Sequence, residues 1–320
     1  MKKDFPFKNL IEALHDRIPQ RGKLAEALTE LLGIEKEAVY RRLRGSVPFS
    51  FQEVHKIAVH FGLSLDGIAE NILLLHRQMT VLTVDLLNPR EKDYRIIENF
   101  TEQLNRLKKD PNSESGAVGT VIPASLCVNY EFIYKFYLFK WAHQFGNLQN
   151  IKPLSEITVT ERLKQINKDF VKTVRSSPKS VYIFDRRFIE NFVNDVRFFF
   201  DIRLITKEDI LRLKKDLHLL LNDLEHFSGD DHFAAGNKPE IFLANIHIDA
   251  NYNYIDSAKC KLTILRSMTF SDSYSFDEII FENMKNWLTF LKRTSTFISE
   301  GSAAERIHFF EQQRKIVEAL

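Results

Sequence analysis

The sequence is poor in cysteine and in net charge, and it has no apolar segment long enough to cross a membrane. The two cysteines, Cys127 and Cys260, are far apart in the sequence, which argues against a disulfide framework. The formal net charge of +2 is too small to indicate a nucleic-acid partner by itself. No window reaches the roughly 18 apolar residues of a membrane span, and residues 1–7 lack the apolar core of a signal peptide. We therefore expect a cytoplasmic protein with no membrane partner.

Recognisable catalytic motifs are also missing. There is no nucleophile elbow, kinase signature or dinucleotide fingerprint, and residues 301–306 lack the glycine spacing and the lysine of a phosphate-binding loop. The best metal candidate is the segment 226–232, with two aspartates between two histidines, but its spacing matches no standard signature. His247 and Asp249 are expected to face solvent. We expect neither an enzyme nor a bound cofactor or metal.

The overall composition is typical of a globular protein. Apolar residues make up 44% and charged residues 28% of a chain of 320 residues, which has room for about two domains. A change of pattern near residue 78 predicts a domain of residues 1–78 and a second one of residues 79–320. The first domain has the more specific sequence signal.

Residues 24–65 have the pattern of short helices that end at glycines. The first helix has leucines at helical spacing, at Leu24, Leu28, Leu31 and Leu32. Gly33 suits the end of that helix, because glycine adopts the left-handed conformation without a Cβ clash. A second helix is predicted over residues 35–44. Ser50 and Glu53 then form a capping box that starts a third helix.

This pattern resembles the helix-turn-helix of the phage-repressor-like (XRE) family of bacterial transcription regulators over residues 8–70. The matching residues are Leu28, Leu32, Gly33, Ile34, Val39, Arg44, Gly45, Ile57, Ala58 and the run from Phe61 to Asp66. Thr29 departs from the family pattern, where alanine is usual. Arg42 also departs from it, because an apolar core residue usually stands there. With a helix over residues 8–18 and another continuing through residue 75, the resemblance implies a bundle of five helices.

The resemblance also implies that residues 35–44 are a recognition helix, which enters the major groove of duplex DNA. The side chains implied to read base edges are Lys36, Glu37, Tyr40 and Arg41. Those implied to contact phosphates are Arg42, Arg44 and Ser46. Because repressor-like modules commonly read two half-sites, we expect a homodimer. Two other interpretations stay open, since such a bundle also serves as a docking platform for proteins and a charged helix face is often only solvated.

The second part of the chain predicts an α+β domain that is mostly helical. Helices are expected over residues 95–109, 160–175, 186–202, 207–227, 278–291 and 302–317. Strands are expected over residues 79–87, 118–126, 246–254 and 259–270, the last two forming an antiparallel hairpin. Residues 110–116 are expected to be a loop. Capping boxes at Ser275 and Ser302 are expected to begin the last two helices.

Residues 118–145 are unusually aromatic. The side chains are Tyr130, Phe132, Tyr134, Phe136, Tyr137, Phe139, Trp141 and Phe145. They predict either a buried element at the centre of the second domain, which is the commoner use of such a stripe, or an aromatic-lined pocket. By analogy with other regulators, this domain is expected to dimerise, to bind a small-molecule or peptide effector that the sequence does not identify, or to do both.

Overall fold

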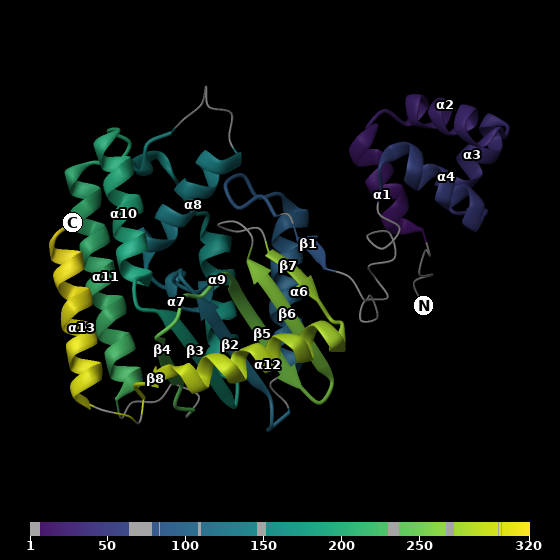
Figure 1. Ribbon diagram of the computed structural model, residues 1–320. Helices are drawn as coiled ribbons and strands as arrows, with labels where there is room; N and C mark the ends of the chain where they lie inside the picture. The colour runs from purple at the N-terminus through teal and green to yellow at the C-terminus, as the bar shows by residue number, and fades with distance from the viewer. Residues whose placement is uncertain are drawn as a thin grey trace. The chain divides into compact units, whose positions relative to one another are not determined.

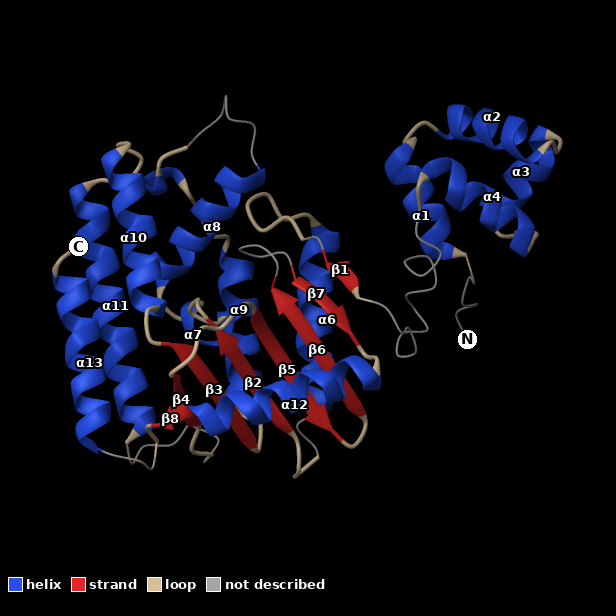
Figure 2. Cartoon of the chain, viewed as in Figure 1, coloured by secondary structure: helices blue, strands red, loops and turns tan. Residues whose placement is uncertain are grey.

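The computed structural model describes residues 7–63, 79–82, 84–107, 110–145, 152–229, 237–266, 272–299, 301 and 303–320. Contacts along the chain divide it into two compact units, Met1–His76 and Arg77–Leu320. The protein is mostly helical, with a helical N-terminal unit and a mixed sheet in the C-terminal unit, as Figure 2 shows. Each unit has its own hydrophobic core.

The described part of the N-terminal unit consists of helices packed around one small core (Figure 1). They are α1 (Lys8–Arg17), α2 (Arg21–Leu32), α3 (Lys36–Leu43) and α4 (Phe51–Phe61). The apolar positions that recur at helical spacing are the ones buried between these helices: Leu10, Leu14, Leu24, Leu28, Val39, Val54 and Ile57. The fifth helix predicted through residue 75 lies outside the described residues.

Two local signals in this unit act as the sequence predicted. Gly33 ends α2 in the left-handed conformation, with φ 66°, and its N–H donates to the carbonyl of Thr29. Ser50 caps α4 through a complete capping box, in which Ser50 Oγ accepts the N–H of Glu53 and the Glu53 carboxylate accepts the N–H of Ser50. These caps fix where α3 and α4 begin relative to the helices before them.

The C-terminal unit is built on an eight-stranded mixed sheet. Its strands are β1 (Thr80–Leu82), β2 (Glu114–Gly119), β3 (Lys179–Asp185), β4 (Glu240–Ala244), β5 (Asn251–Ser257), β6 (Cys260–Arg266), β7 (Asp272–Ser275) and β8 (Ser295–Phe297). The order is β1-β7-β6-β5-β2-β3-β4-β8. The three strands β2, β3 and β4 are parallel, and the other pairs are antiparallel. The predicted antiparallel hairpin is confirmed as β5 and β6.

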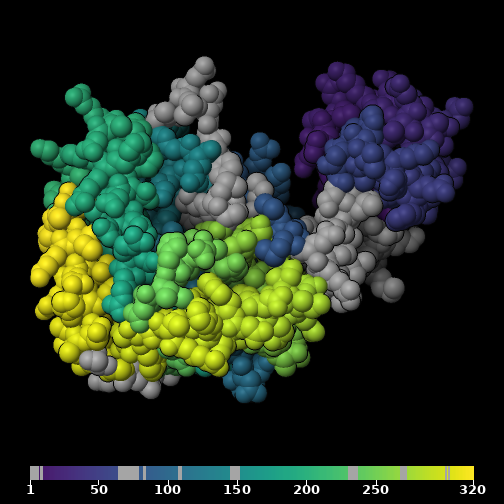
Figure 3. Space-filling model, viewed as in Figure 1, coloured from purple at the N-terminus to yellow at the C-terminus, as the bar shows by residue number. Residues whose placement is uncertain are grey.

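Helices cover both faces of this sheet unequally. They are α6 (Glu91–Leu107), α7 (Ala124–Cys127), α8 (Glu131–Phe145), the 3-10 turn η3 (Leu154–Glu156), α9 (Glu161–Arg175), α10 (Phe188–Asp201), α11 (Lys207–Ser228), α12 (Glu278–Thr294) and α13 (Ala303–Glu318). Of the helices that the structure describes, α12 alone contributes to the core on its face, and Figure 1 shows it lying across the strands. In Figure 3 its atoms form part of the yellow-green surface on this face. The larger core lies on the other face.

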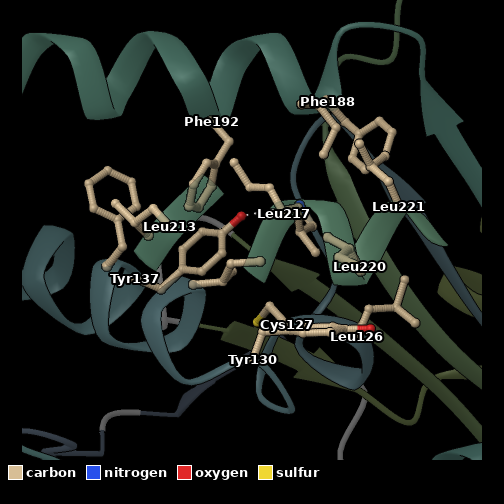
Figure 4. Close-up of a cluster of buried hydrophobic side chains, with 14 of the residues drawn as sticks. Leu126, Cys127, Tyr130, Tyr137, Phe188, Phe192, Leu213, Leu217, Leu220 and Leu221 are labelled. Carbon is tan, nitrogen blue, oxygen red and sulfur yellow. Dashed lines mark hydrogen bonds between the residues drawn. The ribbon is translucent and has the colours of Figure 1, made fainter. Parts of the chain in front are cut away.

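The aromatic helix α8 lies in that larger core. Tyr134, Phe136, Tyr137 and Phe139 are all at most 5% exposed. Figure 4 shows Tyr137 among side chains from neighbouring helices, with its hydroxyl oxygen accepting the N–H of Ile122 at 3.2 Å. This burial confirms the interpretation as core for the central part of the aromatic stretch, whereas Phe132 and Trp141 are half-buried.

Two predictions around β2 are wrong. Residues 110–116 were expected to form a loop, but β2 already begins at Glu114. The strand expected over residues 118–126 ends at Gly119, and Ala124–Cys127 is helical. The strand begins early because Glu114 and Ser115 pair with both β3 and β5, so tertiary pairing overrides the loop-forming composition before them.

Further differences concern the later strands and one helix start. The first hairpin strand begins at Asn251, and residues 245–250 connect it to β4. The cap of α12 is Asp277, whose carboxylate accepts the N–H groups of Ile279 and Ile280, so Ser275 does not cap this helix. Strands β3, β4, β7 and β8 were not predicted. The expected capping box at Ser302 lies outside the described residues.

Candidate nucleic-acid interface

The recognition helix predicted from the sequence is α3, and a short turn sets its direction. Residues 33–35 connect α2 to α3, as in helix-turn-helix units, where a turn of about three residues often contains glycine. Val39 anchors α3 in the core with no exposed surface, while Ala38 and Leu43 are half-buried. The opposite face of α3 is therefore left open to solvent.

The four predicted base-reading residues lie on that open face. Positions 36, 37, 40 and 41 are neighbours on one side of a helix, because residues three to four apart stack along it. The side chains of Lys36 and Glu37 are 47% and 71% exposed, Arg41 is exposed and Tyr40 is half-buried. Among the described residues, no side chain or backbone group forms a hydrogen bond or ion pair with the Arg41 side chain. The structure thus presents one aromatic and three charged side chains together.

Exposed ion pairs hold two cations of this surface. Arg44 Nη2 lies 2.8 Å from Glu37 Oε1, and Lys36 Nζ lies 2.9 Å from Glu26 Oε1. The hydrogen bond with Glu26 raises the pKa of Lys36, so this amine stays charged. Solvent-exposed pairs of this kind contribute little to stability and are screened by salt. Both cations are therefore able to exchange their carboxylate partners for phosphates or base edges.

Two of the predicted phosphate-contacting residues share this surface. Arg44 follows the last turn of α3 with a side chain 60% exposed, and Ser46 is exposed in the loop after it. The N–H of Ser46 donates to the carbonyl of Arg41 at 2.8 Å, which holds the loop against the helix end. Arg44 and Ser46 therefore lie beside the predicted base-reading residues, as expected for residues predicted to contact phosphates.

Arg42, the third predicted phosphate contact, is placed differently. Its side chain is only 18% exposed, and its guanidinium forms a two-pronged ion pair with Glu53 of α4. Sequence reasoning recognised Glu53 only as half of a capping box and missed this partner. The signal that could have found it is the charge of Arg42 at a position where the family pattern has an apolar residue, since an arginine withdrawn from water needs an acceptor.

Thr29, the other departure from the family pattern, is accommodated locally. Its Oγ1 donates a 2.8 Å hydrogen bond to the carbonyl of Ala25, one turn earlier in α2. Its hydroxyl is therefore satisfied without disturbing the packing of the helix.

Comparison with known proteins finds a similarity for this unit. Residues 7–79 match the BetR domain family. The BetR domain is a helix-turn-helix family linked to transcription regulation, so the match supports a DNA-binding regulatory role and DNA as a partner. It covers less than a quarter of the chain. No curated protein and no solved structure matches the chain.

Where the structure describes the remaining candidate sites, they give no second centre. Residues 230–232 of the possible metal-binding segment lie outside the described residues. Among the residues that are described, no group of three or more histidine, cysteine, aspartate and glutamate side chains could hold a metal ion. His247 and Asp249 lie in the connection before β5, not on a strand, with side chains 63% and 92% exposed. No described helix has the length and apolar character needed to span a bilayer.

Proposed function

We propose that this protein is a sequence-specific regulator of transcription whose N-terminal unit binds duplex DNA in the manner of XRE-type repressors. The observation that carries the proposal is the BetR match over a helix-turn-helix whose third helix presents an open, mainly charged face. In this proposal the side chains that read base edges are Lys36, Glu37, Tyr40 and Arg41. Arg44 and Ser46 contact the phosphates on the flank of the groove. No catalytic reaction is assigned to the chain.

The proposal extends to two copies of the chain on one operator. A homodimer would place its two recognition helices in successive major grooves about 34 Å apart, at the half-sites of an inverted repeat. The C-terminal unit, which is larger and has two cores of its own, would supply the dimer contact, bind a small-molecule or peptide effector, or do both. An effector that changes the spacing of the two recognition helices would do so in proportion to the difference between its affinities for the two spacings.

The experiment that tests this function is selection of bound duplexes from random DNA by the full-length protein, followed by a salt titration on the enriched sequences. We expect an inverted repeat whose observed affinity falls steeply as salt rises, because binding releases condensed counterions. The selection is run with and without a cell extract as a source of effector. No enrichment in either condition, together with a shallow salt dependence, would overturn the proposal and favour a protein-docking role.

A matched pair of variants distinguishes the interface from general surface charge. Arg44 and Arg106 are exposed arginines, 60% and 62% exposed, and each pairs with a glutamate of its own helical segment. We expect Arg44→Ala to weaken DNA binding and Arg106→Ala to leave it unchanged. Equal losses in the two variants would show that binding follows net charge and not the face of α3.

A further inference from the structure

The ion pair between Arg42 and Glu53 is more buried than the Lys36–Glu26 and Arg44–Glu37 pairs of the N-terminal unit. Arg42 Nη2 lies 2.9 Å from Glu53 Oε1, and Arg42 Nε donates to Glu53 Oε2 at 3.2 Å. The two side chains are 18% and 16% exposed, whereas those of the Arg44–Glu37 pair are 60% and 71% exposed. A planar guanidinium that meets a carboxylate through two parallel contacts fixes both distance and orientation.

Both partners are also tied to the backbone near them. Arg42 Nη1 donates to the carbonyl of Ala38 at 3.3 Å, so the guanidinium is held against its own helix α3. Glu53 Oε2 accepts the N–H of Ser50 at 2.7 Å, which closes the capping box at the start of α4. Burial alone would raise the pKa of Glu53, but the Ser50 N–H and the Arg42 guanidinium outweigh it and lower that pKa. One carboxylate therefore joins the last turn of α3 to the first turn of α4.

This connection bears on the base-reading face because of where Arg42 lies. It directly follows Tyr40 and Arg41, two of the proposed base readers, and precedes Arg44 by two positions. Val39 is the fully buried apolar anchor of α3, so the rotation of this short helix about its axis needs a second constraint. In the family pattern an apolar residue at position 42 would supply that constraint by packing. Here the two contacts of the Arg42 guanidinium with Glu53 of α4 supply it instead.

We propose that Arg42 is a positioning residue for DNA recognition, which acts through Glu53 to fix the orientation of α3, and that it is not a phosphate contact. The inference rests on the proposed DNA-binding function. In this role the Arg42–Glu53 pair contributes to sequence specificity and not to the phosphate-dependent part of the affinity. The two assignments predict different behaviour, because a phosphate contact changes the salt dependence and a positioning residue changes the ratio of specific to random binding.

The test uses full-length Arg42→Lys and Arg42→Met and the double variant Arg42→Met with Glu53→Gln. Affinities for the selected operator and for a random duplex are measured across a salt series, and circular dichroism melting verifies that each variant is folded. Lysine keeps the charge but loses the fork, so we expect Arg42→Lys to reduce the specificity ratio by about tenfold with the salt slope unchanged. Arg42→Met should reduce the ratio further, because it leaves the Glu53 carboxylate buried without its partner.

Rescue by the double variant decides between the two roles. Glutamine at position 53 still accepts the Ser50 N–H and needs no cation, so we expect the double variant to recover the ratio to within about threefold of the wild type. Arg44→Ala is the control, with a salt slope lower by about one and little change in ratio. An unchanged ratio in Arg42→Lys, or a salt slope lower by about one in both Arg42→Met proteins, would overturn the positioning role. Absence of operator binding by the wild type would overturn the proposed function and this inference together.

Discussion

Replacing Glu114 by glutamine tests the polar cluster that joins α12 to the sheet. The Glu114 side chain is 13% exposed, and its Oε1 accepts hydrogen bonds from Lys285 Nζ at 2.8 Å and Tyr254 Oη at 2.6 Å. Burial alone would raise the pKa of Glu114, but these two hydrogen bonds and the Lys285 charge lower it from 4.5 to about 2. A carboxylate whose pKa is lower in the folded than in the unfolded protein stabilises the folded state at pH values above the unfolded-state pKa. The difference between the two pKa values corresponds to roughly 3 kcal/mol of folding free energy at neutral pH.

We expect Glu114→Gln to lower the free energy of unfolding of the C-terminal unit by about 2–3 kcal/mol at pH 7. The difference from the wild type should disappear as the pH falls from 4.5 towards about 2. Both tryptophans, Trp141 and Trp287, lie in this unit, so fluorescence during urea unfolding reports on it alone. Glu102→Gln is the control, because Glu102 is 61% exposed in a pair along α6. A loss below about 0.5 kcal/mol, or the same pH dependence in wild type and variant, would refute the reasoning.

Four other substitutions test the interface, the core and one strained residue. Arg41→Ala should weaken operator binding by about 1–3 kcal/mol and leave binding to random duplexes unchanged, whereas Arg44→Ala should weaken binding to both. Competition binding assays measure these differences. Equal losses for operator and random duplexes in Arg41→Ala would show that Arg41 does not read bases. Phe136→Ala, at a side chain with no exposed surface that meets the ring of Phe192 at 4.8 Å, should cost about 3–5 kcal/mol in urea unfolding. A small loss there would contradict the core assignment. Arg203 is a non-glycine residue with φ 64° just beyond α10, so Arg203→Gly should stabilise the unit by up to about 1 kcal/mol, measured by thermal melting.

The N-terminal unit was predictable because its signals are local. A glycine at the end of α2, a capping box before α4 and leucines at helical spacing each specify structure within a few residues of themselves. The pairing of Arg42 with Glu53 was not predictable in this way, although the residues are close in sequence. Recognising it requires knowing that α4 returns alongside the last turn of α3, which is a property of the folded unit.

The central strands of the C-terminal unit escaped prediction for a different reason. Residues 180–185 of β3 and 241–244 of β4 are buried along their whole length, because both are interior parallel strands covered on both faces. Such strands show a continuous apolar run and no alternation, so a search for period two passes over them. The hairpin of β5 and β6 was found because apolar and polar residues alternate along it.

The charges of the N-terminal unit divide by burial in a way that suits recognition of DNA. The pairs on the open face, such as Arg44 with Glu37, are exposed and weakly held, so their cations can leave one partner for another. The Arg42–Glu53 pair is half-buried and two-pronged, so its members exchange partners less readily. A helix that reads a groove needs both properties, because its outer side chains must give up their partners to DNA while its axis keeps one orientation. In the proposed function Arg42 and Arg44, two positions apart, would therefore serve opposite purposes, and their burial, not their residue type, would decide which purpose each one serves.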